Sequence, residues 1–116
     1  MILSYTACFY FGQRKEVETM QVTMREEGDA AVAMISGEID HHTAQKIRTE
    51  IDDSVLEGGK TRLILDFSGV TFMDSSGVGL ILGRRRLMEG LGGSLVVRSV
   101  PQSMRRLMAV AGIRIK

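Results

Sequence analysis

The sequence predicts an α/β fold, a single domain with a mixed or parallel central sheet of about four to five strands and helices packed on it. Three observations support this prediction. The chain has 116 residues, which is the length of one domain. Short apolar stretches typical of strands alternate along it with stretches of helical spacing. Glycine-containing breaks separate the two kinds of stretch.

The first half predicts a hairpin followed by a helix. Residues 21–25 alternate as a strand does, Gly28 and Asp29 form a turn, and residues 30–35 predict a buried strand that pairs with the first. Residues 40–43 (DHHT) open a helix, and Gly58 and Gly59 end it. Its apolar positions recur at helical spacing: Ala44, Ile47, Ile51 and Val55.

The second half predicts three more strands and two helices. Residues 62–67 form an apolar strand, which Ser68 and Gly69 end in a turn. Residues 74–77 (DSSG) open a helix that runs to about residue 89, and residues 94–98 form a strand. Pro101 begins a third helix, and residues 113–115 are typical of a strand cut short.

Residues 1–19 stand apart as an N-terminal extension of the domain at residues 20–116. They hold four of the six aromatic residues and show no clear period. The favoured interpretation is a disordered extension or a non-native start, with Met20 beginning the regular pattern. The alternative is an apolar flap that docks elsewhere on the molecule.

Composition narrows the class of protein. Hydrophobic residues make up 44% and charged residues 25%, as in ordinary globular chains. The single cysteine, Cys8, allows no intrachain disulfide, and the apolar runs are shorter than the roughly 18 residues of a membrane span. We therefore expect a cytoplasmic protein that does not enter the membrane.

Charge is divided unevenly along the chain although the net charge is only +1, which argues against direct nucleic-acid binding. Residues 20–74 carry eleven acidic and five basic side chains, whereas residues 75–116 carry one acidic and eight basic side chains. Either the two halves form oppositely charged sides that orient a partner, or they interleave and the asymmetry cancels.

The sequence contains no motif typical of a catalytic or cofactor-binding site. Gly77, Gly79 and Gly83 do not have the spacing of a dinucleotide-binding turn, and we interpret them as letting the helix approach the sheet closely. The only two histidines, His41 and His42, are adjacent and cannot both ligate one metal from a helix start. We expect no enzyme activity, no metal and no cofactor.

The stretch at residues 72–79 (FMDSSGVG) is more informative. Asp74 or one of the serines caps a helix, but one cap needs one residue, and three polar residues follow each other here. We expect Met73 and the serines to be exposed where the strand ends. A phosphate on Ser75 would lie at the positive end of a helix dipole, so it would change the surface and leave the fold intact.

A second helix start lies at residues 37–43 (GEIDHHT). Asp40 and Ser75 both follow a strand and begin a helix, so in a parallel sheet they share one edge. The run Arg84, Arg85 and Arg86 is usually a solvated helix face, and beside that edge it would meet acidic groups of a partner.

These segments resemble the STAS domain, the sulfate-transporter and anti-sigma-antagonist family, and within it the bacterial anti-sigma factor antagonists of sporulation. The resemblance covers residues 20–115 and is carried by residues 37–44 (GEIDHHTA), 71–79 (TFMDSSGVG) and 81–84 (ILGR), with a weaker match from Pro101 to Ile113. The C-terminus stops where relatives usually continue through more strand and a final helix. A missing helix would leave apolar surface bare, and we hypothesise that residues 1–11 cover part of it, either in the same molecule or from a second copy.

The resemblance implies a partner switch. The unmodified protein would bind an anti-sigma factor that is also a serine kinase, which frees a sigma factor. The kinase would phosphorylate Ser75 and so end the complex, and a serine phosphatase would reset it. The implied partner-binding residues are Asp40, His41, Met73, Asp74, Ser75, Ser76, Gly77 and Arg84. The alternative is a STAS module that acts as an interaction scaffold in a sensory or transport assembly.

Overall fold

The computed structural model describes residues 21–116, so the predicted extension at residues 1–19, and its role in covering apolar surface, lie outside the described residues. The described part forms β1 (Val22–Glu27), β2 (Ala30–Ile39), α1 (His41–Gly58), β3 (Arg62–Met73), α2 (Ser75–Gly90), β4 (Ser94–Arg98) and α3 (Gln102–Val110). The predicted α/β class is confirmed, and so is the order of the elements up to and including α3.

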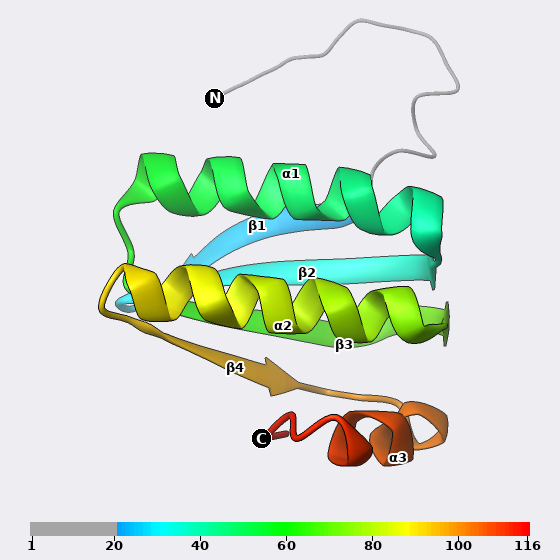
Figure 1. The fold of residues 1–116 in the computed structure, drawn as a ribbon. Coiled ribbons are helices and arrows are strands. Elements are labelled where there is room, and N and C mark those ends of the chain that lie inside the picture. The colour runs from blue at the N-terminus through cyan, green and yellow to red at the C-terminus, as the bar shows by residue number, and fades with distance from the viewer. Residues whose placement is uncertain (1–20) are drawn as a thin grey trace, which may run out of the picture.

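The strands form one mixed sheet in the order β1-β2-β3-β4. β1 and β2 pair antiparallel as the predicted hairpin, and the pairs β2–β3 and β3–β4 are parallel. Helices α1 and α2 lie side by side on one face of the sheet, and α3 lies beyond β4 (Figure 1). The alternation of the strands turns every second side chain towards these helices.

The core lies between this sheet face and the two helices. The predicted apolar stripe of α1 is buried, since Ile47, Ile51 and Val55 are at most 1% exposed. The same core cluster contains strand residues that point to this face of the sheet: Ala33, Ile35, Leu63, Leu65 and Val97. The packing of these side chains fixes α1 and α2 on the sheet and so fixes where both helices begin.

β2 and β3 are longer than predicted, and the turn expected at Ser68 and Gly69 is wrong. Both residues lie inside β3, which stays paired with β2 across two register shifts. A Cβ on Gly69 would lie 2.9 Å from Cβ of Ser36, so glycine allows the strands to approach closely. Pairing with β2 thus overrides the local turn preference of this dipeptide.

The short strand predicted at residues 113–115 is reduced to one bridge. Ile115 pairs in parallel with Val97, and the Lys116 N–H donates to the Val97 carbonyl at 2.8 Å. The Ile113 N–H still donates to the Met108 carbonyl, so the chain is leaving α3 and is not yet extended. No helix within residues 21–116 combines the length and apolarity needed to cross a membrane.

The two oppositely charged halves of the chain lie largely on different sides of the molecule. The strands follow one another across the sheet in sequence order, so β1, β2 and α1 lie on one side and β4 and α3 lie on the other. Arg84 and Arg98 of the basic half nevertheless pair with Asp52, Asp66 and Glu27 of the acidic half. Each of the two interpretations left open by the sequence therefore holds in part, because the halves lie on different sides and the charge asymmetry partly cancels.

Candidate functional site

Two helix starts lie side by side at one edge of the sheet. β2 ends at Ile39 and β3 ends at Met73, and these two residues are paired in the parallel register. The backbone N–H of Asp74 donates to the Ile39 carbonyl at 3.2 Å, which ties the strand ends together. Asp40 and Asp74 each follow a strand and cap a helix, so the arrangement is the one that the sequence predicts.

Asp40 caps α1 through a reciprocal pair of hydrogen bonds. Its carboxylate accepts from the Thr43 N–H at 2.9 Å, and the Thr43 hydroxyl oxygen accepts from the Asp40 N–H at 2.8 Å. The hydrogen bond from the Thr43 backbone is the main reason that the pKa of Asp40 lies below its usual value. Asp40 therefore presents a fixed negative charge at this edge at neutral pH.

Asp74 caps α2 and leaves the neighbouring serine available. Its carboxylate accepts from the Ser76 N–H at 2.8 Å. Ser75 is the first residue of α2 and is exposed, and its hydroxyl makes no hydrogen bond within residues 21–116. The capping role thus falls to Asp74, and the Ser75 hydroxyl faces solvent beside the positive end of the helix dipole.

The expectation that Met73 is exposed is wrong. It is only 8% exposed, and its side chain fills the space where a Cβ on Gly77 would lie. A side chain at position 77 would collide with Met73, so this glycine is required by close packing. Gly79 and Gly83 have no such role because a Cβ would meet nothing within 4 Å at either position. The interpretation that all three glycines allow close packing therefore holds for Gly77 alone.

Phe72 is a surface residue that the sequence interpretation missed. It is 50% exposed and pairs in register with Glu38 on β2. Successive strand residues point to opposite faces, so burial of Met73 turns Phe72 outward. Had β3 been extended to residue 73, this alternation would have identified the exposed aromatic ring.

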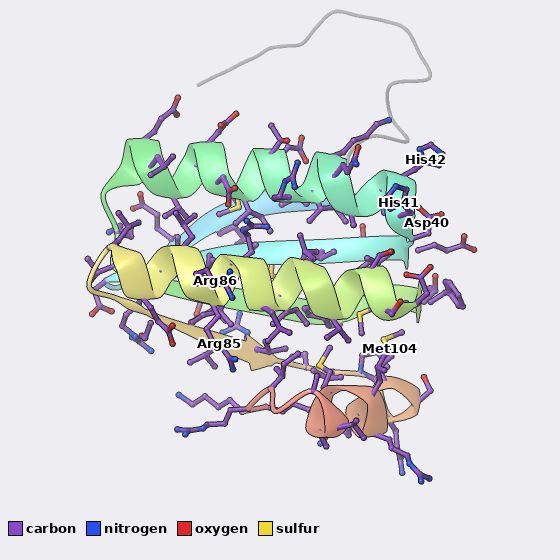
Figure 2. All side chains as sticks on the ribbon, in the orientation of Figure 1. Asp40, His41, His42, Arg85, Arg86 and Met104 are labelled. Carbon is purple, nitrogen blue, oxygen red and sulfur yellow. The ribbon has the colours of Figure 1, made fainter. Side chains whose placement is uncertain are left out.

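His41 and His42 are exposed in the first turn of α1, and their ring centroids are 6.1 Å apart. Figure 2 shows both rings with Asp40 at the end of the molecule to which β2 and β3 point. His41 and Ser76 line a shallow groove of about 300 Å³ between the two helices. This groove joins the start of α1 to the start of α2.

Arg84 is not the solvated cation that its sequence context indicates. It lines the far end of the same groove, but its side chain is 9% exposed and its Nε lies 2.7 Å from Oδ1 of Asp52 on α1. The contact is an ion pair without good hydrogen-bond geometry. Burial lowers the pKa of Arg84 and raises that of Asp52, and each charge partly offsets the shift of the other. Arg84 thus clamps α2 to α1.

The other two arginines of the run point elsewhere. The Arg85 side chain reaches the C-terminal segment, where Nη1 donates to the Gly112 carbonyl at 3.3 Å, and Arg86 is exposed. Both lie well along α2 from its start (Figure 2). Helical rise puts Arg85 about 15 Å from Ser75 along the axis, so the run does not flank the serine.

The described residues show no cluster suited to a metal. Within residues 21–116, no three His, Cys, Asp or Glu side chains gather closely enough to hold an ion. What the edge does offer is the exposed Ser75 hydroxyl at one of two neighbouring capped helix starts, with carboxylates and imidazoles at the same edge and the exposed ring of Phe72 near the end of β3. Such a surface is suited to docking of another protein.

Comparison with known proteins assigns the chain to one family. Residues 21–115 match the family described as the STAS domain. The chain belongs to the STAS domain family. Its relatives include the anti-sigma F factor antagonist of Lysinibacillus sphaericus, which is 36% identical over 73% of each chain. The anti-sigma F factor antagonist of Paenibacillus polymyxa is 33% identical over 81% of this chain and 80% of its own length.

Solved structures agree with this assignment. The unphosphorylated form of the anti-sigma factor antagonist SpoIIAA superposes on the STAS domain of this chain with a TM-score of 0.67, at 32% identity, covering 82% of this chain and 86% of that one. The phosphorylated form of the Bacillus cell fate determinant SpoIIAA gives a TM-score of 0.65 at 33% identity, covering 79% and 84%. SpoIIAA is thus similar to this chain in both sequence and fold.

Proposed function

We propose that this chain is an anti-sigma factor antagonist that is switched by phosphorylation of Ser75. In the unphosphorylated form it binds an anti-sigma factor that is also a serine kinase, and a sigma factor is freed for transcription. The kinase transfers a phosphate from ATP to Ser75 and the complex dissociates. A serine phosphatase restores the binding form. The chain is a regulatory binding protein of the cytoplasm and not an enzyme.

The observation that carries this proposal is the exposure of the Ser75 hydroxyl. A serine must be reached by the catalytic site of the kinase, and Ser75 is exposed at the first position of α2. Its neighbour Ser76 is half-buried and supplies its N–H to the cap. The names of the relatives, and the existence of SpoIIAA in a phosphorylated form, point the same way.

The proposed docking surface surrounds Ser75. Asp40, His41, Asp74 and Ser76 contribute polar groups, and we add the exposed ring of Phe72 as an apolar anchor. Met73, Gly77 and Arg84 belong to the same proposed set of partner-binding residues. Because they are buried, they act by holding the starts of α1 and α2 in place.

A phosphate on Ser75 would alter binding and not folding. It adds about two negative charges at the N-terminus of α2, where the helix dipole tolerates an anion. The same charges join the carboxylates of Asp40 and Asp74 at a surface that the kinase must approach closely. Bulk and like-charge repulsion there weaken docking while the core stays as it is.

Phosphate mapping with a matched pair of variants tests the proposal. The protein is incubated with an anti-sigma kinase of the family and ATP, and the modified residue is located by mass spectrometry. We expect one phosphate on Ser75, none on Ser75→Ala and normal labelling of Ser76→Ala, which keeps the capping N–H. Phosphate on Ser76, or labelling of Ser75→Ala equal to that of the unmodified sequence, would refute the assignment.

A further inference from the structure

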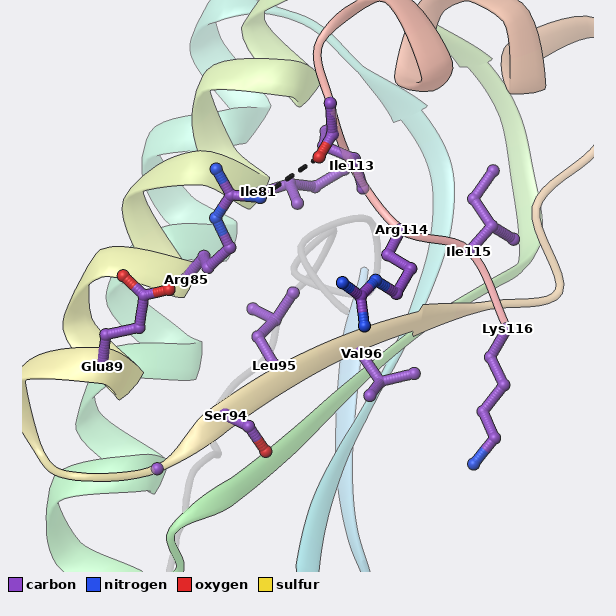
Figure 3. A pocket seen from close by; sticks show the side chains of 12 residues that line it. Ile81, Arg85, Glu89, Ser94, Leu95, Val96, Ile113, Arg114, Ile115 and Lys116 are labelled. Carbon is purple, nitrogen blue, oxygen red and sulfur yellow. Dashed lines mark hydrogen bonds between the residues drawn. The ribbon is translucent and has the colours of Figure 1, made fainter.

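A second candidate interaction surface lies far from Ser75, at the opposite end of α2. A groove of about 570 Å³ runs between α2, β4 and the C-terminal segment at residues 112–116 (Figure 3). Glu89, close to the last residue of α2, lines it. None of the residues that line it also lines the groove between the starts of α1 and α2.

The floor of the groove is apolar. Ile81 and Ile113 are buried beneath it, and Leu95 projects from β4 between α2 and the C-terminal segment (Figure 3). Leu95 and Ile115 are only partly buried. A ligand that fills the groove would remove this remaining apolar surface from water, which favours binding.

The rim of the groove is basic. Arg85, Arg114 and Lys116 line it against one carboxylate, Glu89. Two other cations of this half are already paired, Arg84 with Asp52 and Arg98 with Asp66. None of the three rim cations forms an ion pair within residues 21–116, so their charge is available to an anionic ligand.

The groove also contains an open strand edge. The Val97 carbonyl accepts from Lys116 on the outer side of β4, and residues two apart in a strand direct their backbone groups to the same side. The N–H and C=O of Leu95 therefore face the groove, and they have no backbone partner within residues 21–116. An extended peptide can satisfy such groups by adding a strand.

We propose that this groove binds an acidic, apolar-containing peptide segment of a partner protein. The segment lies extended beside Leu95, places an apolar side chain on the floor and sets carboxylates against Arg114, Lys116 and Arg85. A peptide fits better than nucleic acid because the floor is aliphatic, with no aromatic ring among the lining residues on which a base would stack.

Paired model peptides test the proposal on the full chain. One fluorescent peptide alternates Glu with Val and the other alternates Lys with Val, and fluorescence anisotropy measures the dissociation constant of each. We expect the acidic peptide to bind and the basic one not to bind, with weaker binding at higher salt. The double variant Arg114→Glu, Lys116→Glu should raise the dissociation constant at least about tenfold. The matched variant Lys46→Glu, on the exposed face of α1, should leave it unchanged.

Hydrogen exchange tests the strand edge separately. The Leu95 amide should exchange rapidly in the free protein and become protected when the acidic peptide is bound. Equal affinity for the two peptides would overturn the proposal, as would tighter binding of a single-stranded oligonucleotide. A Leu95 amide already protected without peptide would show that the chain itself fills the groove.

Discussion

The absence of a side chain at Gly77 helps to set the geometry of the sheet edge that carries Ser75. Met73 ends β3 and packs into the space beside Gly77, one turn into α2. Burial of Met73 turns Phe72 outward and leaves Ser75 exposed two residues later. The position of the proposed phosphoacceptor therefore depends on a contact that lies beneath it.

Substitution of this glycine is the prediction that belongs to single residues. Gly77→Ala forces Met73 to move, and we expect the free energy of unfolding to fall by about 1–3 kcal/mol, as for other overpacked sites. Gly79→Ala is the matched control, because a Cβ meets nothing there and alanine favours a helix by up to about 1 kcal/mol. Urea denaturation followed by circular dichroism measures both. Equal stability of the two variants would contradict the packing role of Gly77.

At the scale of elements, ion pairs join three strands across the sheet face opposite α1 and α2. Arg98 on β4 donates to Asp66 on β3 at 2.9 Å and binds both carboxylate oxygens of Glu27 on β1 at 3.0 and 3.1 Å. Asp66 also accepts from the Ser68 N–H at 2.9 Å. Burial alone would raise the pKa of Asp66, but the hydrogen bonds from Ser68 and Arg98 outweigh it and lower the pKa.

This network predicts a pH dependence of stability. Because the folded-state pKa of Asp66 is lowered, its stabilisation is present above the ordinary aspartate pKa and is lost as pH falls through the lowered value. Asp66→Asn should therefore lower the free energy of unfolding at pH 7 and reduce its decline between about pH 5 and pH 2. Urea titrations at several pH values in this range measure the free energy of unfolding, and Asp53→Asn, on the exposed face of α1, is the control. If the free energy of unfolding of Asp66→Asn fell with pH as steeply as that of the unmodified protein, the network would be excluded as the cause of the decline.

Element types were predictable from the sequence, whereas strand lengths were not. Helical spacing located α1, and its capping residues, Asp40 and Thr43, lie within the predicted DHHT start. The continuation of β3 past Ser68 and Gly69 depends on pairing with β2, which is a contact between distant residues. The burial of Met73 and Arg84 was unpredictable for the same reason. Met73 packs against Gly77, and Arg84 pairs with Asp52 on another helix, so both depend on contacts that the local sequence does not show.

For the whole molecule, the order of the strands determines both candidate surfaces. Parallel pairing of β2 with β3 brings the starts of α1 and α2 together, so residues 40 and 75 meet at one edge. The sequence-ordered sheet also separates the acidic half from the basic half, and the basic groove lies on the β4 side. The shared edge was predictable from alternating strands and helices. The groove was not, because it depends on where the chain goes after α3.

The central claim is that a phosphate on Ser75 controls docking of an anti-sigma factor. We predict that the protein phosphorylated at Ser75, and Ser75→Asp more weakly, loses affinity for that partner because negative charge is added at the contact surface. Thr61→Asp is the control, since Thr61 is also exposed but lies directly before β3 begins, at the opposite end of the sheet.

Isothermal titration calorimetry of the unmodified, phosphorylated and control proteins against the anti-sigma factor is the direct measurement. We expect the dissociation constant of the phosphorylated protein to rise at least about a hundredfold. The Thr61→Asp value should equal that of the unmodified protein, and circular dichroism should show the same fold in all forms. A phosphorylated protein that binds as tightly as the unmodified one would contradict the switch.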